Sequence, residues 1–550
     1  MIAIKSSGSS GSYADLVLTG GKIWFGRRNE LPAPAALAVS GERIAAVGSE
    51  AQIRGLIGPA TRVVNLKGAL LLPGFIDCHV HLMWGGFQLL RLDLRDSATP
   101  AEFVRRIAAR AASLPKGAWI LGGSWDNENW RPDAFPDRRL IDPATPDHPV
   151  FLTRTDTHIG VANSLALARA GITRETPDPP GGIIVRDPET GEPTGLLKDK
   201  AIDLLLAAVP APGPAEQDAA MAAALGYLAA NGVTSIHDVS GPEDWEVFAR
   251  GHSQGSLTAR IYARTPLALG RPREASGPAP ASAWLRFGGF KAFVDGSLGA
   301  GTALFFDSYD DLPGNAGLLS SDMFPEGRME QLIAEADRAG IQVSVHAIGD
   351  KANATLLDIF ERVAAQNGPR DRRLRIEHAQ HLRPEDIPRM ARLKAIASVQ
   401  PYHLADDGRW AERRLGKERC RWAYPFRSLS DAGVLLAYGT DWPVAPIDPL
   451  AGIAAAVTRC PVDGSRPGGW IPQERLSIAD AVWFYTGAGA FAEFAEQEKG
   501  RLEAGMLADI AVLSDDIFTL SPKELRHVRI ECTIAGGKMV YVSPTVTFTA

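Results

Sequence analysis

Residues 73–82 read PGFIDCHVHL, and this stretch decides the fold and the site that we expect. Its apolar run indicates a β-strand that ends in His79 and His81. Side chains two residues apart on a strand point to the same face, so the two imidazoles can bind one metal ion. In a barrel of parallel strands, the strand C-termini converge on one mouth. The remaining ligands are therefore expected at the ends of other strands.

The middle of the chain alternates apolar strand candidates with amphipathic helices. Helices are expected over residues 326–339, 352–366 and 477–490, the last with Ser477 as its N-cap and Asp480 at the capping-box position. Such alternation from residue 73 to residue 495 predicts a parallel sheet closed into a (β/α)8 barrel. More strand candidates occur than the eight that a barrel needs. We therefore expect an insertion subdomain at roughly residues 110–210, where PDPPGGIIVRDPETGEPTG indicates a β-hairpin.

Both ends of the chain are rich in short strands and turns. Residues 13–72 contain Gly-Gly and Gly-Glu turn signals between alternating apolar stretches, and residues 496–550 repeat this style. We expect the two segments to form one small composite β-sandwich domain. Residues 1–12, which include a Ser/Gly run, are expected to be flexible.

Polar residues mark several of the middle strands. His346 ends IQVSVH, His378 ends LRIEH, Asp441 follows VLLAYGT, and Lys291 lies within GGFKAFVDG. Counted back from Asp441 as strand eight, His378 lies on strand six, His346 on strand five and Lys291 on strand four. Each has an ordinary explanation when taken singly: a hydrogen-bonded histidine, an ion-paired lysine, an aspartate that caps a helix. Taken together, the four histidines and the aspartate predict a metal site held by His79, His81, His346, His378 and Asp441, with Lys291 close by on strand four.

Composition narrows the class of protein. The chain has 550 residues, of which 45% are hydrophobic and 22% charged, as in an ordinary globular protein. Its net charge of −6, with both signs mixed along the chain, predicts neither a nucleic-acid partner nor a membrane surface partner. No apolar run is long enough to span a membrane, and the N-terminal apolar run is too short for a signal peptide. The four cysteines are far apart and unpaired in pattern, so we expect a cytoplasmic protein without disulfides.

These motifs resemble those of the amidohydrolase superfamily, with H-x-H on strand one, a lysine on strand four, histidines on strands five and six and an aspartate on strand eight. Within it, the chain is similar to the YtcJ-like branch (amidohydrolase family 3), which includes N-substituted formamide deformylases. The phrases that carry the similarity are GGSWDNENW, DTHIGVANSLAL, GGIIVRD, PTGLLKD, FVDGSLGA, SVHAIGD, RIEHAQH, SVQPYH and GTDWPV. The similarity runs from the first strands to GRLEAGMLADIAVL.

The site and the resemblance together predict hydrolysis of an amide-like C–N bond by metal-bound hydroxide. The expected substrate is a small organic molecule such as an N-substituted formamide, an N-acyl compound or a cyclic amide. A bound divalent metal lowers the pKa of water from 15.7 to about 7. Asp441 would take the proton from the attacking water and pass it to the leaving nitrogen. No organic cofactor is expected, and a homodimer stays open.

Two other functions stay open at this point. One is hydrolytic deamination of a heterocycle at a single metal, although that branch of the superfamily lacks the strand-four lysine. The other is a scaffold without catalysis, against which the complete ligand set counts.

The lysine raises the question of one ion or two. At a pKa of about 10.4, an unmodified lysine carries a positive charge and has no lone pair for a metal. We expect Lys291 to be carboxylated on its ε-nitrogen and to bridge two ions, with Zn²⁺ the first choice and Mn²⁺, Fe²⁺ or Co²⁺ as alternatives. The alternative is a lysine that pairs with a neighbour such as Asp295, with one metal held by histidines.

Five further residues are candidates for substrate binding. His158 in TDTHIGVANS resembles a substrate-loop histidine, and His403 follows strand seven, from which it could reach the site. Trp125 and Asp126 could line an apolar pocket, although Trp125 could equally belong to the insertion core. His237 ends another strand, and a buried histidine satisfied by its neighbours would explain it too.

Overall fold

The computed structural model describes residues 13–127, 130–132, 134–154, 159–179, 182–270 and 282–546. It consists of two compact units, one formed by Met1–Leu82 with Leu225–Ala550 and the other by Met83–Ala224. The segment 1–12, expected to be flexible, lies outside the described residues.

Eight parallel strands form the barrel of the first unit, as the sequence predicted. In sheet order they are β6 (Phe75–Val80), β13 (Val233–Val239), β14 (Arg260–Pro266), β15 (Leu285–Phe293), β16 (Val343–Ala347), β17 (Arg375–His378), β18 (Ile396–Val399) and β19 (Leu436–Tyr438). All of β6 is buried, as expected for a strand covered on both faces. Two further segments with a strand pattern, AWILGGSW and PVFLTRT, lie outside the barrel and form β8 and β9.

The last and the first strands meet through a short parallel contact rather than a long ladder. Val80 and Trp442 form an isolated parallel bridge, and the amide of His81 donates to the carbonyl of Trp442 at 2.9 Å. Asp77 on β6 accepts from the amide and the hydroxyl of Thr440, the latter at 2.6 Å. The loop after β19 is thereby joined to the strand that carries the two histidines.

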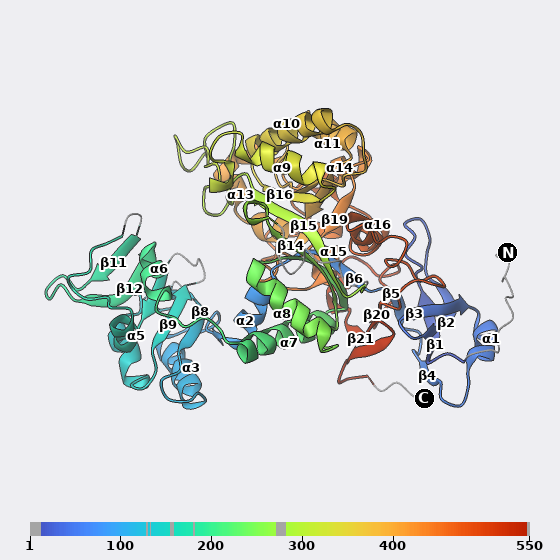
Figure 1. The fold of residues 1–550 in the computed structure, drawn as a ribbon, viewed down its shortest axis with the longest axis horizontal. Coiled ribbons are helices and arrows are strands. Elements are labelled where there is room, and N and C mark those ends of the chain that lie inside the picture. The colour runs from blue at the N-terminus through green and yellow to red at the C-terminus, as the bar shows by residue number, and fades with distance from the viewer. Residues whose placement is uncertain are drawn as a thin grey trace. The chain divides into compact units, whose positions relative to one another are not determined.

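Helices accompany the barrel strands, and Figure 1 shows α9, α10, α11 and α14 together at one side of the sheet. Their bounds are α8 (Pro242–Ser253), α9 (Arg328–Arg338), α10 (Asp350–Asn367), α11 (Asp386–Leu393), α12 (Pro401–Asp407), α13 (Ala411–Cys420), α14 (Phe426–Asp431), α15 (Pro449–Thr458), α16 (Ile478–Phe484) and α17 (Gly487–Ala492). The predicted helices 326–339 and 352–366 correspond to α9 and α10.

The single helix expected over residues 477–490 is wrong, because the structure breaks it into α16 and α17. Its start is as expected, with the Ser477 hydroxyl accepting from the amide of Asp480 at 3.1 Å. Thr486 leaves the helical conformation at φ −133°, and Gly487 and Gly489 follow. Glycine disfavours a helix interior by about 1 kcal/mol. At Gly489 a Cβ would approach Ile76 to 2.8 Å, so close packing against β6 requires a residue without a side chain.

The two ends of the chain build one sheet. It contains β1 (Leu16–Ile23), β2 (Ala33–Ser40), β3 (Arg43–Gly48), β4 (Arg62–Asn65), β5 (Leu70–Pro73), β20 (Ile510–Leu513), β21 (Ile530–Ala535) and β22 (Lys538–Val542). The joint is the antiparallel pair of β5 with β20. Leu18 and Leu37 from one end share a core with Ile510 and Ile534 from the other. That this sheet forms a β-sandwich stays a prediction.

The second unit contains the segment predicted as an insertion. Its sheet is formed by β7 (Leu92–Asp93), β8 (Ile120–Trp125), β9 (Val150–Arg154), β10 (Ile159–Ala162), β11 (Gly182–Arg186) and β12 (Pro193–Asp199). The expected hairpin is present as the antiparallel pair of β11 and β12. The helices of this region are α2 (Leu82–Leu90), α3 (Pro100–Ala112), α4 (Arg138–Ile141), α5 (Ser164–Arg169), α6 (Ala201–Leu206) and α7 (Pro214–Ala230).

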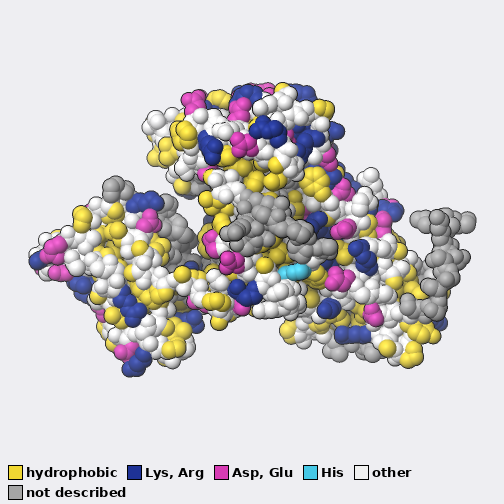
Figure 2. Space-filling view, in the orientation of Figure 1, with side chains coloured by type: hydrophobic (Ala, Val, Ile, Leu, Met, Phe, Trp, Pro, Cys, Tyr) yellow, Lys and Arg dark blue, Asp and Glu magenta, His cyan; other side chains and the backbone are white. Residues whose placement is uncertain are grey.

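The surface charges and the state of the cysteines are as the composition predicted. Figure 2 shows basic and acidic side chains interspersed on the visible face. The four cysteines are free thiols. Within the described part of the chain, no helix combines the length and the apolar character that crossing a membrane requires.

A buried ion pair connects the terminal sheet to the barrel and gives a stability prediction. Asp509 accepts from Arg260 Nε at 2.7 Å and from Nη2 at 3.0 Å, and Arg260 is 2% exposed. Asp509→Ala leaves this buried guanidinium with only the longer contact of 3.8 Å to Glu42, so we expect the free energy of unfolding to fall by about 3 kcal/mol. Urea unfolding followed by circular dichroism measures the change.

The matched control for this ion pair is Asp431→Ala, which removes the pair with Arg427, where both side chains are more than half exposed. There we expect a loss below about 1 kcal/mol. Equal losses in the two variants would contradict the prediction.

Candidate metal centre

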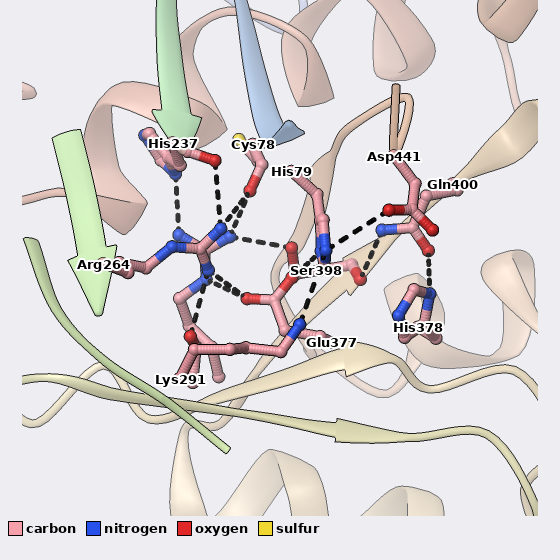
Figure 3. A network of polar contacts seen from close by, with 12 residues as sticks. Cys78, His79, His237, Arg264, Lys291, Glu377, His378, Ser398, Gln400 and Asp441 are labelled. Atoms are coloured by element: carbon pink, nitrogen blue, oxygen red, sulfur yellow. Dashed lines mark hydrogen bonds and ion pairs between the residues drawn. The ribbon is translucent and has the colours of Figure 1, made fainter. Parts of the chain in front are cut away.

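His79 lies at the centre of the site, between Glu377 and Asp441 (Figure 3). Its Nδ1 is 2.6 Å from Glu377 Oε2. Burial lowers the pKa of His79 to about 3, so the ring is neutral. Because the carboxylate accepts, Nδ1 carries the proton and Nε2 keeps its lone pair. This is the form of imidazole that binds a metal ion.

Asp441 and His81 complete a group around His79 Nε2. Asp441 Oδ1 is 3.3 Å from His81 Nε2 and 3.5 Å from His79 Nε2. The three ligand atoms lie within 4.8 Å of one another, which is close enough for one ion. Asp441 has a left-handed backbone, φ 62°, and its amide donates to the carbonyl of His79 at 2.7 Å. It starts no helix, so the helix-cap alternative does not apply.

His378 is oriented by Gln400. Its Nδ1 is 2.8 Å from Gln400 Oε1, which accepts the ring proton and leaves Nε2 free. Burial lowers the pKa of His378 well below its ordinary value, so this imidazole is neutral too. The ring centroids of His378 and His79 are 5.0 Å apart.

Glu377 is held in the barrel interior by two arginines. Arg264 Nη1 donates to Glu377 Oε1, and Arg375 Nε lies 3.1 Å from the same oxygen. Burial alone would raise the pKa of Glu377, but the two guanidinium groups outweigh it and hold the pKa well below its usual range. The group that orients His79 is therefore a carboxylate.

Lys291 points into the same space from β15 and is 2% exposed. Its Nζ is 3.4 Å from His79 Nε2 and 4.7 Å from the centre of the Phe293 ring. Among the described residues it forms no ion pair with a carboxylate, and Asp295 instead accepts from the amides of Leu304, Ile348 and Gly349. Burial lowers the pKa of Lys291 to about 8.

His346 lies beside His378, with ring centroids 4.4 Å apart. Its Nε2, however, is 2.9 Å from the carbonyl of Gly296 and 3.4 Å from Asp295 Oδ1. The structure does not bring this residue into either group of ligand atoms that could share an ion. Its role as a ligand stays a prediction.

His403 comes from the first turn of α12 and reaches the site. Its Nε2 is 3.9 Å from Asp441 Oδ2, and its ring is parallel to that of His378, with centroids 6.3 Å apart. His378, His403 and Asp441 form the second group whose ligand atoms lie within 4.8 Å of one another.

His237 is engaged elsewhere in the barrel interior. Its Nδ1 is 2.7 Å from Arg375 Nη1, and its Nε2 is 3.4 Å from Glu493 Oε1. Glu493 also pairs with Lys499 at 2.7 Å and Arg286 at 2.7 Å. These contacts place His237 in a network of buried charges, although its Nε2 makes no hydrogen bond among the described residues.

The remaining sequence candidates belong to the second unit. Trp125 is fully buried in the core of that unit, where its indole donates to the carbonyl of Leu152 at 2.9 Å. Asp126 pairs with Arg154 at 3.0 Å. His158 lies outside the described residues. Substrate binding by these three stays a prediction.

Four further residues of the site were not predicted from the sequence: Glu377, Gln400, Arg264 and Arg375. Glu377 stands directly before His378, and Gln400 directly follows the strand-seven segment, so both were adjacent to motifs that were noticed. Neither position carries a signal that predicts which imidazole it contacts. The arginines are on β14 and β17, where charged side chains facing a barrel interior are not expected from an apolar strand pattern.

Comparisons with known proteins identify the family of this chain. The profile of the amidohydrolase family matches residues 62–541. Protein LONG AFTER FAR-RED 3 of Arabidopsis thaliana is 41% identical over 97% of this chain and 92% of its own length. The "Putative amidohydrolase YtcJ" of Bacillus subtilis is 36% identical over 88% of this chain and 91% of its own length. N-substituted formamide deformylase of Arthrobacter pascens is 30% identical over 92% of this chain and 94% of its own length.

A solved structure supports the fold. The crystal structure of an uncharacterized metal-dependent hydrolase from Pyrococcus furiosus superimposes with a TM-score of 0.76 at 29% identity, covering 92% of this chain and 100% of that chain. These matches confirm the resemblance that the motifs predicted.

Gln400 provides a test of the oriented imidazoles. Gln400→Ala removes the acceptor of the His378 Nδ1 proton, so we expect metal affinity to fall about 10–100-fold, as for other groups that orient a ligand. Competition with a chelator, read by elemental analysis, measures this. His79→Ala/His81→Ala should lose the ion of the first group altogether. The control is His252→Ala. His252 lies on α8 and its Nε2 contacts the Ser282 hydroxyl, so this variant should bind the metal like the wild type.

Proposed function

This chain belongs to the amidohydrolase family of metal-dependent hydrolases, and from that premise we propose that it hydrolyses an amide-like C–N bond in a small organic molecule. N-substituted formamides are the substrate class that we favour, because a relative that covers most of the chain is named for that activity. N-acyl and cyclic amides are the neighbouring classes.

The observation that carries the proposal is the group of His79, His81 and Asp441. Two imidazoles and a carboxylate offer three ligand atoms within 4.8 Å of one another, and the first imidazole is neutral with its proton fixed on Nδ1. This donor set suits Zn²⁺, and it leaves one tetrahedral position for water or substrate. The residues present therefore fit a divalent ion.

Each residue has a defined task in this proposal. An ion held by His79, His81 and Asp441 would supply Lewis-acid polarisation and a water of lowered pKa. Asp441 Oδ2, the oxygen not closest to the two histidines, can take a proton from the attacking water and return it to the leaving nitrogen. Glu377 and Gln400 keep the ring protons of His79 and His378 away from the reaction space.

We also propose that Lys291 is carboxylated and contributes to a second ion site. CO₂ reacts with the neutral amine, and a pKa of about 8 makes neutral amine far more abundant at pH 7 than in a free lysine. Its distance of 3.4 Å from His79 Nε2 puts the group within reach of the first site. Burial opposes the ammonium form more strongly than the nearby charges of Glu377 and Asp441 support it, so the pKa is lowered.

Asp441→Asn tests the proton transfer. Metal-loaded enzyme is screened on N-substituted formamides, N-acyl amino acids, cyclic amides and an aminated heterocycle, with amine or ammonia release as the readout. Asparagine keeps the shape but cannot accept the proton, so we expect kcat per bound metal to fall at least about a hundredfold. Asp431→Asn, an exposed aspartate on α14, should leave kcat unchanged.

Near-normal kcat in Asp441→Asn would exclude this residue as the base. Turnover of the heterocycle alone would favour the deaminase alternative. A wild-type protein that binds no divalent metal would favour the scaffold.

Carboxylation of Lys291 is checked by ¹³C NMR after growth and purification with ¹³C-bicarbonate. We expect a carbamate signal that is present in the wild type and in Lys499→Arg and absent in Lys291→Arg. Lys499 is the matched buried lysine: burial lowers its pKa too, but its Nζ is 2.7 Å from Glu493, whose charge favours the ammonium form. Re-formation of the signal after acid treatment should be faster at pH 8 than at pH 6, because the neutral fraction of the amine rises as the pH approaches the pKa of about 8. A wild type without the signal would refute the carbamate.

A further inference from the structure

His403 has a ring nitrogen in the site that nothing in the described structure uses. Nε2 is enclosed, and it has no hydrogen-bond partner among the described residues. A buried polar atom without a partner is uncommon in folded proteins and calls for a ligand, a water or a catalytic task.

An unbonded nitrogen alone does not identify a site, as a second histidine shows. His381 Nδ1 is also buried and unbonded, but its ring faces the side chains of Phe305 and Tyr424. His403 instead faces His378 and Asp441, whose ligand atoms it approaches within 4.8 Å. The position of His403 is therefore what distinguishes it.

The first turn of α12 holds His403 in this position. Pro401 begins the helix, and the amide of His403 donates to the carbonyl of Gln400 at 3.1 Å. Gln400 in turn accepts from His378 Nδ1, and the rings of His378 and His403 are tilted by only 9°. The start of α12 thus places two groups at the site: the side-chain amide of Gln400, which orients His378, and the imidazole of His403.

This nitrogen could bind a metal ion or donate a hydrogen bond to the substrate, and its distance to Asp441 favours the second task. Tetrahedral ligands at about 2.0–2.2 Å from zinc lie roughly 3.4 Å apart. His403 Nε2 and Asp441 Oδ2 are 3.9 Å apart, which is wider than that edge and too long for a direct hydrogen bond. The spacing instead suits two oxygens on one carbon, one bonded to each group.

We propose that His403 donates a hydrogen bond from Nε2 to the carbonyl oxygen of the substrate, an inference that rests on the proposed function. When water attacks the carbonyl carbon, its proton goes to Asp441 and the C=O π electrons move to the carbonyl oxygen. His403 stabilises that oxyanion. The electrons then re-form the C=O bond, the C–N bond breaks, and Asp441 returns the proton to the leaving nitrogen.

The experiment compares His403→Ala with His403→Gln in metal-loaded enzyme. Glutamine has an N–H donor that can reach the place of Nε2, whereas alanine has none. We expect kcat to fall about 10²–10³-fold in His403→Ala, as for other lost oxyanion donors, and to recover by at least about tenfold in His403→Gln. Metal content should be unchanged in both. His381→Ala, matched for burial, should retain kcat within about threefold.

Formate provides a readout that does not depend on turnover, since it carries two oxygens on one carbon. Calorimetry should show that formate binds the metal-loaded His403→Ala protein at least about tenfold more weakly than the wild type, with His403→Gln in between. If no amide is hydrolysed but this order of affinities holds, the proposed function fails and the donor role stands. Loss of metal in His403→Ala would make the residue a ligand and overturn the proposal. Equal kcat and equal formate affinity in all variants would overturn it as well.

Discussion

The carboxylate of Glu377 has to stay ionised in the dry interior of the barrel, and the arrangement of the site depends on it. Burial opposes that charge, and Arg264 and Arg375 offset the cost. The same carboxylate fixes the proton of His79 on Nδ1, which leaves Nε2 free on the side of Asp441. A change to any of these charges would alter the protonation or the orientation of the His79 imidazole.

Part of the interior of this barrel is therefore occupied by charged side chains, where the fold usually has apolar layers. Below the metal centre, Arg375 connects Glu377 to His237, and His237 adjoins the cluster of Glu493 with Lys499. Buried ion pairs of this kind add little net stability, but removing one partner costs several kcal/mol, because a charge is then left alone. Fold stability and the orientation of the ligands are consequently coupled through the same interior charges.

The ends of two strands leave regular geometry where the site needs it. In a regular strand Glu377 and His378 would point to opposite faces. His378 adopts φ 75° and Asp441 φ 62°, in the left-handed region that non-glycine residues seldom occupy. These conformations turn both side chains toward the mouth, where His79 and His403 meet them. Such strain typically persists where surrounding contacts over-determine it, and here the bonds to Gln400 and to the His79 carbonyl do so.

The sequence by itself determined the barrel, the order of its candidate ligands, the β11–β12 hairpin and the N-cap at Ser477, because each is written in the spacing of neighbouring residues. The sequence also showed more strand candidates than a barrel needs, but only the structure identified β8 and β9 as the two that lie outside it. Only the tertiary structure decided that Glu377 and Gln400 orient the imidazoles, that His237 joins Arg375 and that α16 and α17 are separate. The physical reason is the separation along the chain of the residues that interact. Periodicity reports which face a residue occupies, whereas the direction of a side chain beyond a strand end depends on one backbone angle and on charges that the chain supplies from hundreds of residues away.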